Sequence, residues 1–155
     1  MKPEVKLPDF MGVAMREARA AAARAEVPVG AVVVREGVIL AQAGNRTREL
    51  SDPTAHAEML AIRAACAMLG AERLTGADLY VTLEPCAMCA GAISFARLRR
   101  LYFAAGDEKG GAVVNGGRFF ATATCHHSPE VYSGLGEKEA AALLTDFFRA
   151  RRVDS

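Results

Sequence analysis

The chain has 155 residues, a formal net charge of +1 and 52% hydrophobic residues, which suits one compact domain, and we expect residues 1–155 to form a single domain. The near balance of 19 basic and 18 acidic residues excludes attachment to nucleic acid or membrane by bulk charge alone, although it allows a local basic surface. Four cysteines are too few for a disulfide framework and no targeting or membrane segment is visible, so we expect a cytoplasmic protein without membrane contact.

The first half of the chain alternates between helical and extended patterns. An alanine-rich segment with scattered charges predicts a helix over 10–25. The β-branched run 27–34 predicts a buried strand, and a turn at 36–37 leads to a second strand over 38–43. After a polar stretch, apolar residues recur at spacings of three and four and predict a helix that ends at Gly70. These apolar residues are Met59, Ile62, Cys66 and Leu69.

The second half repeats the alternation. We expect a strand over 78–83, a helix from 85 to about 96, and a strand over 98–103. The glycine-rich segment 106–124 has no clear period and predicts a loop, and a closing helix follows over 137–152. Strands that alternate with helices predict a layered α/β domain with helices on both faces of a sheet.

Two short segments, DPTAHAE and EPCAMC, carry reactive side chains near predicted helix starts. The first contains His56 and Glu58, and the second contains Cys86 and Cys89. In each segment an acidic residue and a proline come first, and proline suits the first position of a helix. The free N–H groups and the positive dipole end of a helix start lower a cysteine pKa, which favours the thiolate that a metal needs.

The spacing of these residues fits a catalytic zinc site. Cys86 and Cys89 are three residues apart, so one helical turn places both sulfurs on one side. Together with His56 they provide three zinc ligands and leave a fourth position for water. Two thiolates neutralise the charge of the zinc ion, so this ion should lower the pKa of its bound water less than an ion held by three histidines. A nearby base would then help to remove the proton from that water. Glu58 lies on a different side of the helix from His56 and is better placed to face that position than to bind metal.

These residues also have other interpretations. Cys86 and Cys89 would suit buried helix positions or a redox dithiol, but neither interpretation explains the nearby His56 and Glu58. Taken singly, His56 would be a hydrogen-bonded core histidine and Glu58 a solvated helix glutamate. Cys66 falls on an apolar helix face and is predicted to be a small core residue. The Cys-His-His run at 125–127 would suit a second metal site, but we favour an ordinary loop.

The H-x-E pattern ending at Glu58, followed by P-C-x-x-C ending at Cys89, resembles the signature of zinc nucleobase deaminases. Longer segments resemble the bacterial tRNA-specific adenosine deaminases: EVPVGAV, GNR, DPTAHAE, LYVTLEPCAMCAG and AALLTDFFRARR. These matches span most of the chain from Glu26 onward. The stretch AVVNGGRFFATAT, residues 112–124, departs from the family pattern, so the resemblance assigns no role within this stretch.

The resemblance implies a three-layer α/β/α cytidine-deaminase-like fold with a central mixed sheet of about five strands. It also implies one zinc ion per subunit and hydrolytic conversion of adenosine to inosine at the wobble position of a tRNA anticodon loop, with an arginine tRNA expected. Water attacks C6 of an extruded adenine, and Glu58 passes a proton to the ring and then to the leaving amine. The implied partners are a tRNA anticodon stem-loop and a second copy of the chain in a homodimer.

The resemblance also assigns substrate contacts. Asn45 matches a residue that hydrogen-bonds the nucleoside, although it would also suit a turn cap. Ala57 is expected to offer its backbone N–H to the base. Asp107 matches a position near the ribose, where a 2′-hydroxyl distinguishes RNA from DNA. Basic residues that end the last helix either contact RNA phosphates or simply complement the helix dipole. They are Arg149, Arg151 and Arg152.

Two other functions stay open at this point. A zinc deaminase of free bases or nucleosides, such as guanine or cytosine, would share the metal site and need no basic flank. A non-catalytic zinc module would bind RNA or a partner protein, but the free fourth ligand position and Glu58 argue against it. Ammonia release from tRNA and from free bases separates the first alternative from the tRNA enzyme.

Overall fold

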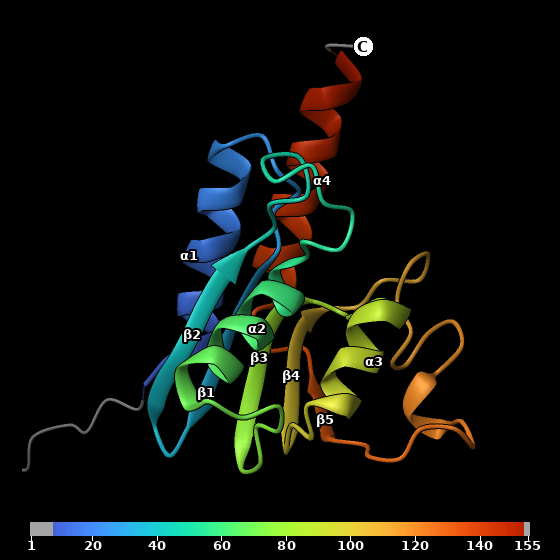
Figure 1. Cartoon of the computed structure of the whole chain (residues 1–155). Helices are drawn as coiled ribbons and strands as arrows, with labels where there is room; N and C mark the ends of the chain where they lie inside the picture. The colour runs from blue at the N-terminus through green and yellow to red at the C-terminus, as the bar shows by residue number, and fades with distance from the viewer. Residues whose placement is uncertain (1–7, 154–155) are drawn as a thin grey trace, which may run out of the picture.

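The computed structural model describes residues 8–153 and places a five-stranded mixed sheet between two layers of helices (Figure 1). β1 is antiparallel to both β2 and β3, whereas β3, β4 and β5 run parallel to one another. In sheet order, the strands are β2 (Val38–Gly44), β1 (Gly30–Arg35), β3 (Ala77–Leu83), β4 (Arg100–Ala105) and β5 (Glu130–Ser133).

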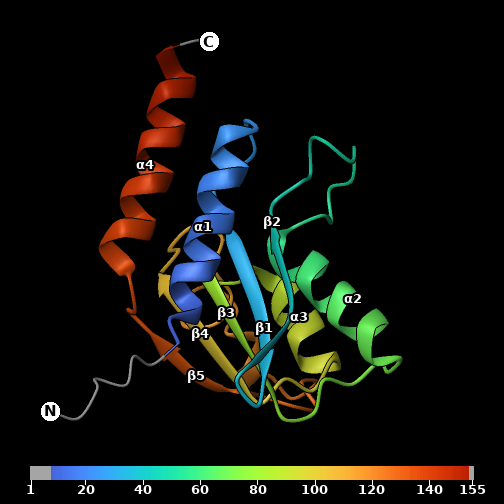
Figure 2. The same cartoon turned by 90° about the vertical axis from the view of Figure 1, so that its left-hand side faces the viewer.

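The helices divide between the two faces of the sheet, as Figure 2 shows. α1 (Phe10–Ala23) and α4 (Glu137–Val153) cover one face, and α2 (Ala57–Leu69) and α3 (Ala87–Phe95) cover the other. A short 3₁₀ turn, η1 (Phe119–Ala121), lies in the loop between β4 and β5. This arrangement confirms the three-layer α/β/α fold with a mixed sheet of five strands. Among the described residues, no helix is both long and apolar enough to span a bilayer.

The core forms on both faces of the sheet because neighbouring strand residues point to opposite sides. Val33 of β1 joins the cluster under α2 and α3, whereas Val32 and Val34 join the cluster under α1 and α4. Phe103 and Leu101 of β4 are buried in the first of these clusters. The nearly continuous β-branched run of β1 therefore has a simple cause: helices cover it on both sides.

Two glycines serve the packing and the ends of elements. Gly30 begins β1 directly beneath α1, where a Cβ atom would overlap the carbonyl oxygen of Ala14. Gly70 follows α2 in a left-handed conformation (φ 64°, ψ 34°), which glycine adopts without steric cost, and so confirms the predicted end of that helix.

Several predicted boundaries were wrong. β1 begins at Gly30 instead of residue 27, β4 begins at Arg100, and α3 begins at Ala87, two residues after the proline that was expected to open it. β5 was not predicted as a strand, because it is a four-residue edge strand with little buried apolar surface. The predicted apolar face of α2 was only partly correct. Of the four apolar residues expected there, only Ile62 is among the buried residues of the helix, which are Ala57, Glu58, Ala61, Ile62 and Ala65.

Candidate active site

His56 and Cys86 occupy equivalent positions at the starts of two neighbouring helices. His56 is the N-cap residue of α2, and Cys86 is the N-cap residue of α3. Serine, threonine or aspartate at such a position normally caps the helix with its side chain. Neither His56 nor Cys86 makes a capping hydrogen bond. Their side chains therefore stay available for each other and for a ligand between the helices.

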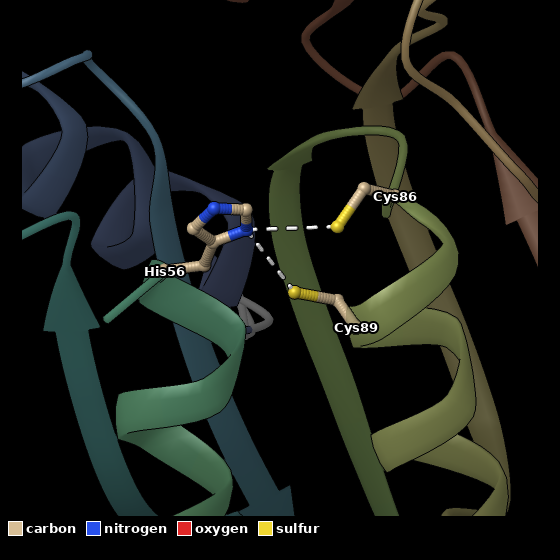
Figure 3. A group of neighbouring side chains, drawn as sticks. All are labelled: His56, Cys86 and Cys89. Atoms are coloured by element: carbon tan, nitrogen blue, oxygen red, sulfur yellow. Dashed lines mark hydrogen bonds between the residues drawn. The ribbon is translucent and has the colours of Figure 1, made fainter. Parts of the chain in front are cut away.

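The predicted zinc ligands lie together in space although they come from separate elements. The Nδ1 atom of His56 lies 3.6 Å from Sγ of Cys86 and 3.5 Å from Sγ of Cys89 (Figure 3). Zinc bonds of about 2.0–2.1 Å to nitrogen and about 2.3 Å to sulfur at a tetrahedral angle put such donors about 3.6 Å apart. The three side chains thus fit one zinc ion, and their soft thiolate and imidazole donors are those that zinc selects.

The electrostatics of the three ligands favour a bound cation. A hydrogen bond from the Cys89 thiol, with a further one from His56, lowers the pKa of Cys86 to about 4. In turn, the hydrogen bond to Cys86 raises the pKa of His56, and the hydrogen bond between Cys89 and Cys86 raises the pKa of Cys89. Cys86 is therefore the thiolate of the cluster, and zinc would replace the protons that Cys86 shares with Cys89 and His56.

Glu58 lies in the first turn of α2 and is almost fully buried, with 4% of its surface exposed. Its side chain lines the same cavity as His56 and Cys86. Burial raises the pKa of the Glu58 carboxyl. Its carboxylate is not one of the three grouped donors, and it accepts a hydrogen bond from the Cys89 thiol.

The ligands open onto a cavity of about 220 Å³ that gathers the other predicted substrate residues. Asn45, Ala57 and Asp107 all line it, whereas Cys89 is fully buried behind its wall. The Asn45 side chain donates to Oγ1 of Thr47 at 3.2 Å, which partly supports its alternative role in a turn. Asp107 likewise uses Oδ1 to accept the backbone N–H groups of two following loop residues.

Several wall residues escaped the sequence analysis. Val27, Val29 and Leu83 make the cavity wall apolar, although the first two were assigned to a strand and the third to a strand end. Glu84 is a buried acid at the carboxyl end of β3 with 2% exposure, and no role was assigned to it. The sequence feature that could have indicated a role for Glu84 is its position, as an acidic residue directly after an apolar strand. Burial tends to raise the pKa of Glu84, but hydrogen bonds from loop amides outweigh it and lower the pKa overall.

The basic residues near the end of α4 lie outside this cavity. Arg149 lines a separate surface hollow with Phe148 and Leu144. Arg151 is exposed and its guanidinium lies 4.8 Å from the centre of the Phe147 ring. The side chain of Arg152 lies outside the described part of the chain. A larger groove between α4 and the sheet connects the two regions, because Asp107 and Leu144 both line it.

The remaining cysteines are structural. Cys66 is half-buried and packs against the core under α2 and α3, and burial raises the pKa of its thiol. Cys125 donates to the carbonyl oxygen of His127, whose ring contacts the carbonyl oxygen of Leu98 at 2.7 Å. Within residues 8–153, the one group of three potential ligands is the His56 cluster.

Comparison with known proteins places this geometry in a family. Residues 5–105 match the family model of the cytidine and deoxycytidylate deaminase zinc-binding region. The tRNA-specific adenosine deaminase of Agrobacterium fabrum is 64% identical over 145 residues, which cover 94% of this chain and 95% of that protein.

Solved structures agree with the sequence relatives. A structure from a study of A-to-I editing by tRNA:A34 deaminases at the wobble position of transfer RNA is 65% identical, with a TM-score of 0.86 over 87% of this chain and 98% of the other. A guanine deaminase from Nitrosomonas europaea is 26% identical, with a TM-score of 0.74 over 94% of this chain and 87% of that one. The fold therefore serves more than one purine deaminase.

Proposed function

The chain belongs to the cytidine and deoxycytidylate deaminase zinc-binding family and, within it, to the bacterial tRNA-specific adenosine deaminases, and from this premise we propose that it converts adenosine to inosine at the wobble position of tRNA. The reaction is hydrolytic: water replaces the amino group at C6 of adenine, and ammonia leaves. The observation that carries the proposal is the three-ligand cluster opening onto a cavity beside a buried carboxylate.

We assign zinc to His56, Cys86 and Cys89. When bound there, zinc supplies a water acidic enough to act as a nucleophile at neutral pH. The distances among the three donor atoms support this assignment, and so does the position of Cys86 at the free N-terminus of α3.

Glu58 is the proposed proton carrier. Its carboxylate is buried in the cavity next to the metal ligands and belongs to a helix that is fixed in the core. We assign it the transfer of a proton to the adenine ring and then to the departing amino group, which requires one group that both accepts and donates a proton.

The remaining site residues are proposed to hold the nucleoside. Asn45, which follows β2, and Ala57, which begins α2, line the cavity together with Asp107 of the loop after β4. We propose hydrogen bonds from Asn45 and Ala57 to the nucleoside and a ribose contact for Asp107. An anticodon stem-loop is the proposed form of the tRNA, with an arginine tRNA expected, because its loop bases are unpaired and easily extruded.

Assembly and location are further parts of the proposal. We propose a homodimer in the cytoplasm, where the tRNA substrate is found. Met68 on α2 and Phe95 on α3 expose 64% and 78% of their surface, which is unusual for large apolar side chains and suits a contact between copies. Light scattering at micromolar concentration measures the oligomeric state directly, and a monomer would contradict this part.

The test of the function itself compares substrates. Purified protein is incubated with a transcribed arginine tRNA, with free guanine, with cytosine and with adenosine, and ammonia release is measured in each case. Sequencing of the tRNA then locates any adenosine that is read as guanosine at the first anticodon position. Inosine at that position supports the proposal, and turnover confined to free guanine would indicate a guanine deaminase instead.

A further inference from the structure

Glu84 is a buried carboxylate whose negative charge is balanced by hydrogen bonds. It follows the last residue of β3 and precedes the helix that carries Cys86 and Cys89, and 2% of its surface is exposed. Among the residues that the structure describes, no lysine, arginine or histidine forms an ion pair with it. A buried charge without a counter-ion requires several hydrogen-bond donors.

The loop after β4 supplies these donors. The Oε1 atom of Glu84 accepts the backbone N–H of Asp107 at 3.0 Å and Nδ2–H of Asn115 at 2.7 Å. The Oε2 atom accepts the backbone N–H groups of Val113, Val114 and Asn115 at 3.1, 2.9 and 3.0 Å. One carboxylate thereby binds both ends of the segment 107–115.

The loop also closes tightly around the carboxylate. The position of Gly111 leaves no space for a side chain, because a Cβ atom there would overlap the carboxyl carbon of Glu84 and lie 2.5 Å from the carbonyl oxygen of Asp107. The next residue, Ala112, donates its N–H to the carbonyl oxygen of Pro85 at 2.9 Å. The segment is therefore wrapped around Glu84 and fastened to the start of α3.

This segment forms one wall of the substrate cavity. Asp107 and Gly110 line the cavity, and both belong to the loop that Glu84 holds. His56 and Glu58, in contrast, belong to α2, which makes no hydrogen bond to Glu84. Loss of the Glu84 contacts would free one wall and leave α2, with His56 and Glu58 at its start, in place.

We propose that Glu84 is the positioning residue of the substrate cavity, which fixes the loop 107–115 so that Asp107 and Gly110 meet the bound nucleoside. This inference rests on the function proposed above. It also gives the glycine-rich loop a role that its sequence did not reveal: the first part is a fixed wall of the cavity.

Glu84→Gln is the decisive variant because it keeps the size of the side chain. A carboxylate only accepts hydrogen bonds, whereas an amide presents one NH₂ group, which must face either the two donors at Oε1 or the three at Oε2. Either orientation opposes donors to donors and leaves buried N–H groups without an acceptor. Asp78→Asn is the matched control. Asp78 is a buried carboxylate at the opposite end of β3, where it binds Arg99 through two hydrogen bonds of 3.0 and 2.8 Å.

The experiment measures amide hydrogen exchange, zinc content, and kcat and KM for deamination of a tRNA anticodon stem-loop. In Glu84→Gln we expect amide exchange across 107–115 to be about tenfold faster or more. A loss of ~1.4 kcal/mol in the stability of the closed loop raises the exchange rate tenfold, and an unsatisfied buried donor costs about that much. Zinc content should be unchanged, and kcat/KM should fall by about 100-fold, mainly through KM. Asp78→Asn should lose thermal stability and keep wild-type exchange in the loop and a wild-type KM.

The division between KM and kcat separates positioning from a general folding defect. A folding defect lowers the concentration of active enzyme, which reduces the apparent kcat and leaves KM unchanged. The proposal is overturned if kcat/KM is unchanged while the loop exchanges freely, if KM stays constant while kcat falls, or if zinc is lost together with activity.

A second pair of variants tests the loop from its own side. Gly111→Ala introduces a Cβ atom against Glu84, whereas Gly117→Ala changes the same loop where no atom lies within 4 Å of the added group. We expect a raised KM and faster exchange in the first variant only. Equal behaviour of the two variants would contradict the proposal. Wild-type protein that fails to deaminate tRNA would refute the proposed function, and the exchange measurement would still test whether Glu84 holds the loop.

Discussion

Replacement of Glu58 by glutamine removes the proposed proton carrier and leaves the shape of the site almost unchanged. Glu58 lies in the first turn of α2 with 4% exposure, and an amide of the same size fills the same space. An alanine there would leave a cavity, so its effects on folding and on catalysis would be mixed.

The magnitude follows from the role assigned to the carboxylate. A positioned general acid or base contributes about 10²- to 10⁴-fold to the rate, which is about 3 to 5 kcal/mol of barrier at ~1.36 kcal/mol per tenfold. Because a glutamine oxygen can still accept the hydrogen bond that Glu58 accepts from the Cys89 thiol, the Glu58→Gln variant should bind zinc as the wild type does. We therefore expect kcat to fall by that factor with full zinc content.

The assay follows inosine formation in a tRNA anticodon stem-loop under single-turnover conditions, with zinc measured by atomic emission on the same sample. Glu72→Gln serves as the control, because Glu72 is an exposed glutamate just beyond α2. A rate for Glu58→Gln within threefold of the wild type, with zinc in place, would refute the assigned role. Loss of zinc in this variant would show instead that the carboxylate supports the metal ligands.

Other expected outcomes concern the metal, the RNA and the fold. Cys89→Ser should lose zinc and activity, whereas Cys66→Ala should keep both, as metal analysis and the tRNA assay will show; retained zinc in Cys89→Ser would exclude it as a ligand. tRNA binding should weaken with salt at a log–log slope of roughly −0.7 per phosphate contacted, and Arg149→Gln should make that slope less negative by about that amount if Arg149 contacts a phosphate. An unchanged slope would favour a purely structural role at the end of the helix. Gly30→Ala should cost about 3 kcal/mol or more and lower Tm by roughly 6–12 °C, because the added methyl group overlaps the backbone of α1. Gly91→Ala, where nothing lies within 4 Å, should raise Tm slightly as alanine does inside a helix, and equal shifts in the two variants would contradict the close approach of β1 to α1.

The elements with a clear period were predictable because local patterns decide them. The β-branched run of β1 and the alanine-rich α1 were assigned to the correct class. The ends of elements were less predictable: β4 begins at Arg100, two residues later than expected, and the first three residues of the predicted β1 lie before the strand. Val27 and Val29 are apolar for another reason, since they line the substrate cavity.

The metal site was predictable for a local reason as well. His56 and Glu58 are two residues apart, and Cys86 and Cys89 are separated by one helical turn, so short-range geometry already restricts where each pair points. The role of Glu84 was not predictable. Its hydrogen-bond partners lie 23 to 31 residues further along the chain, in a loop without a recognisable period.

The amino-acid sequence by itself determined the chemical groups of the site: an imidazole, two thiols and a carboxylate at helix starts. Because helix geometry is fixed, the spacing of these residues also determined the relative directions in which their side chains point. Only the tertiary structure decided which helix starts meet, because the 3.5–3.6 Å distances between His56 and the two cysteines depend on the packing of α2 and α3 into one core cluster beside the sheet. It also decided that a glycine-rich loop would wrap around Glu84. A buried charge must be satisfied by whatever donors the folded chain brings to it, and those donors are distant in sequence.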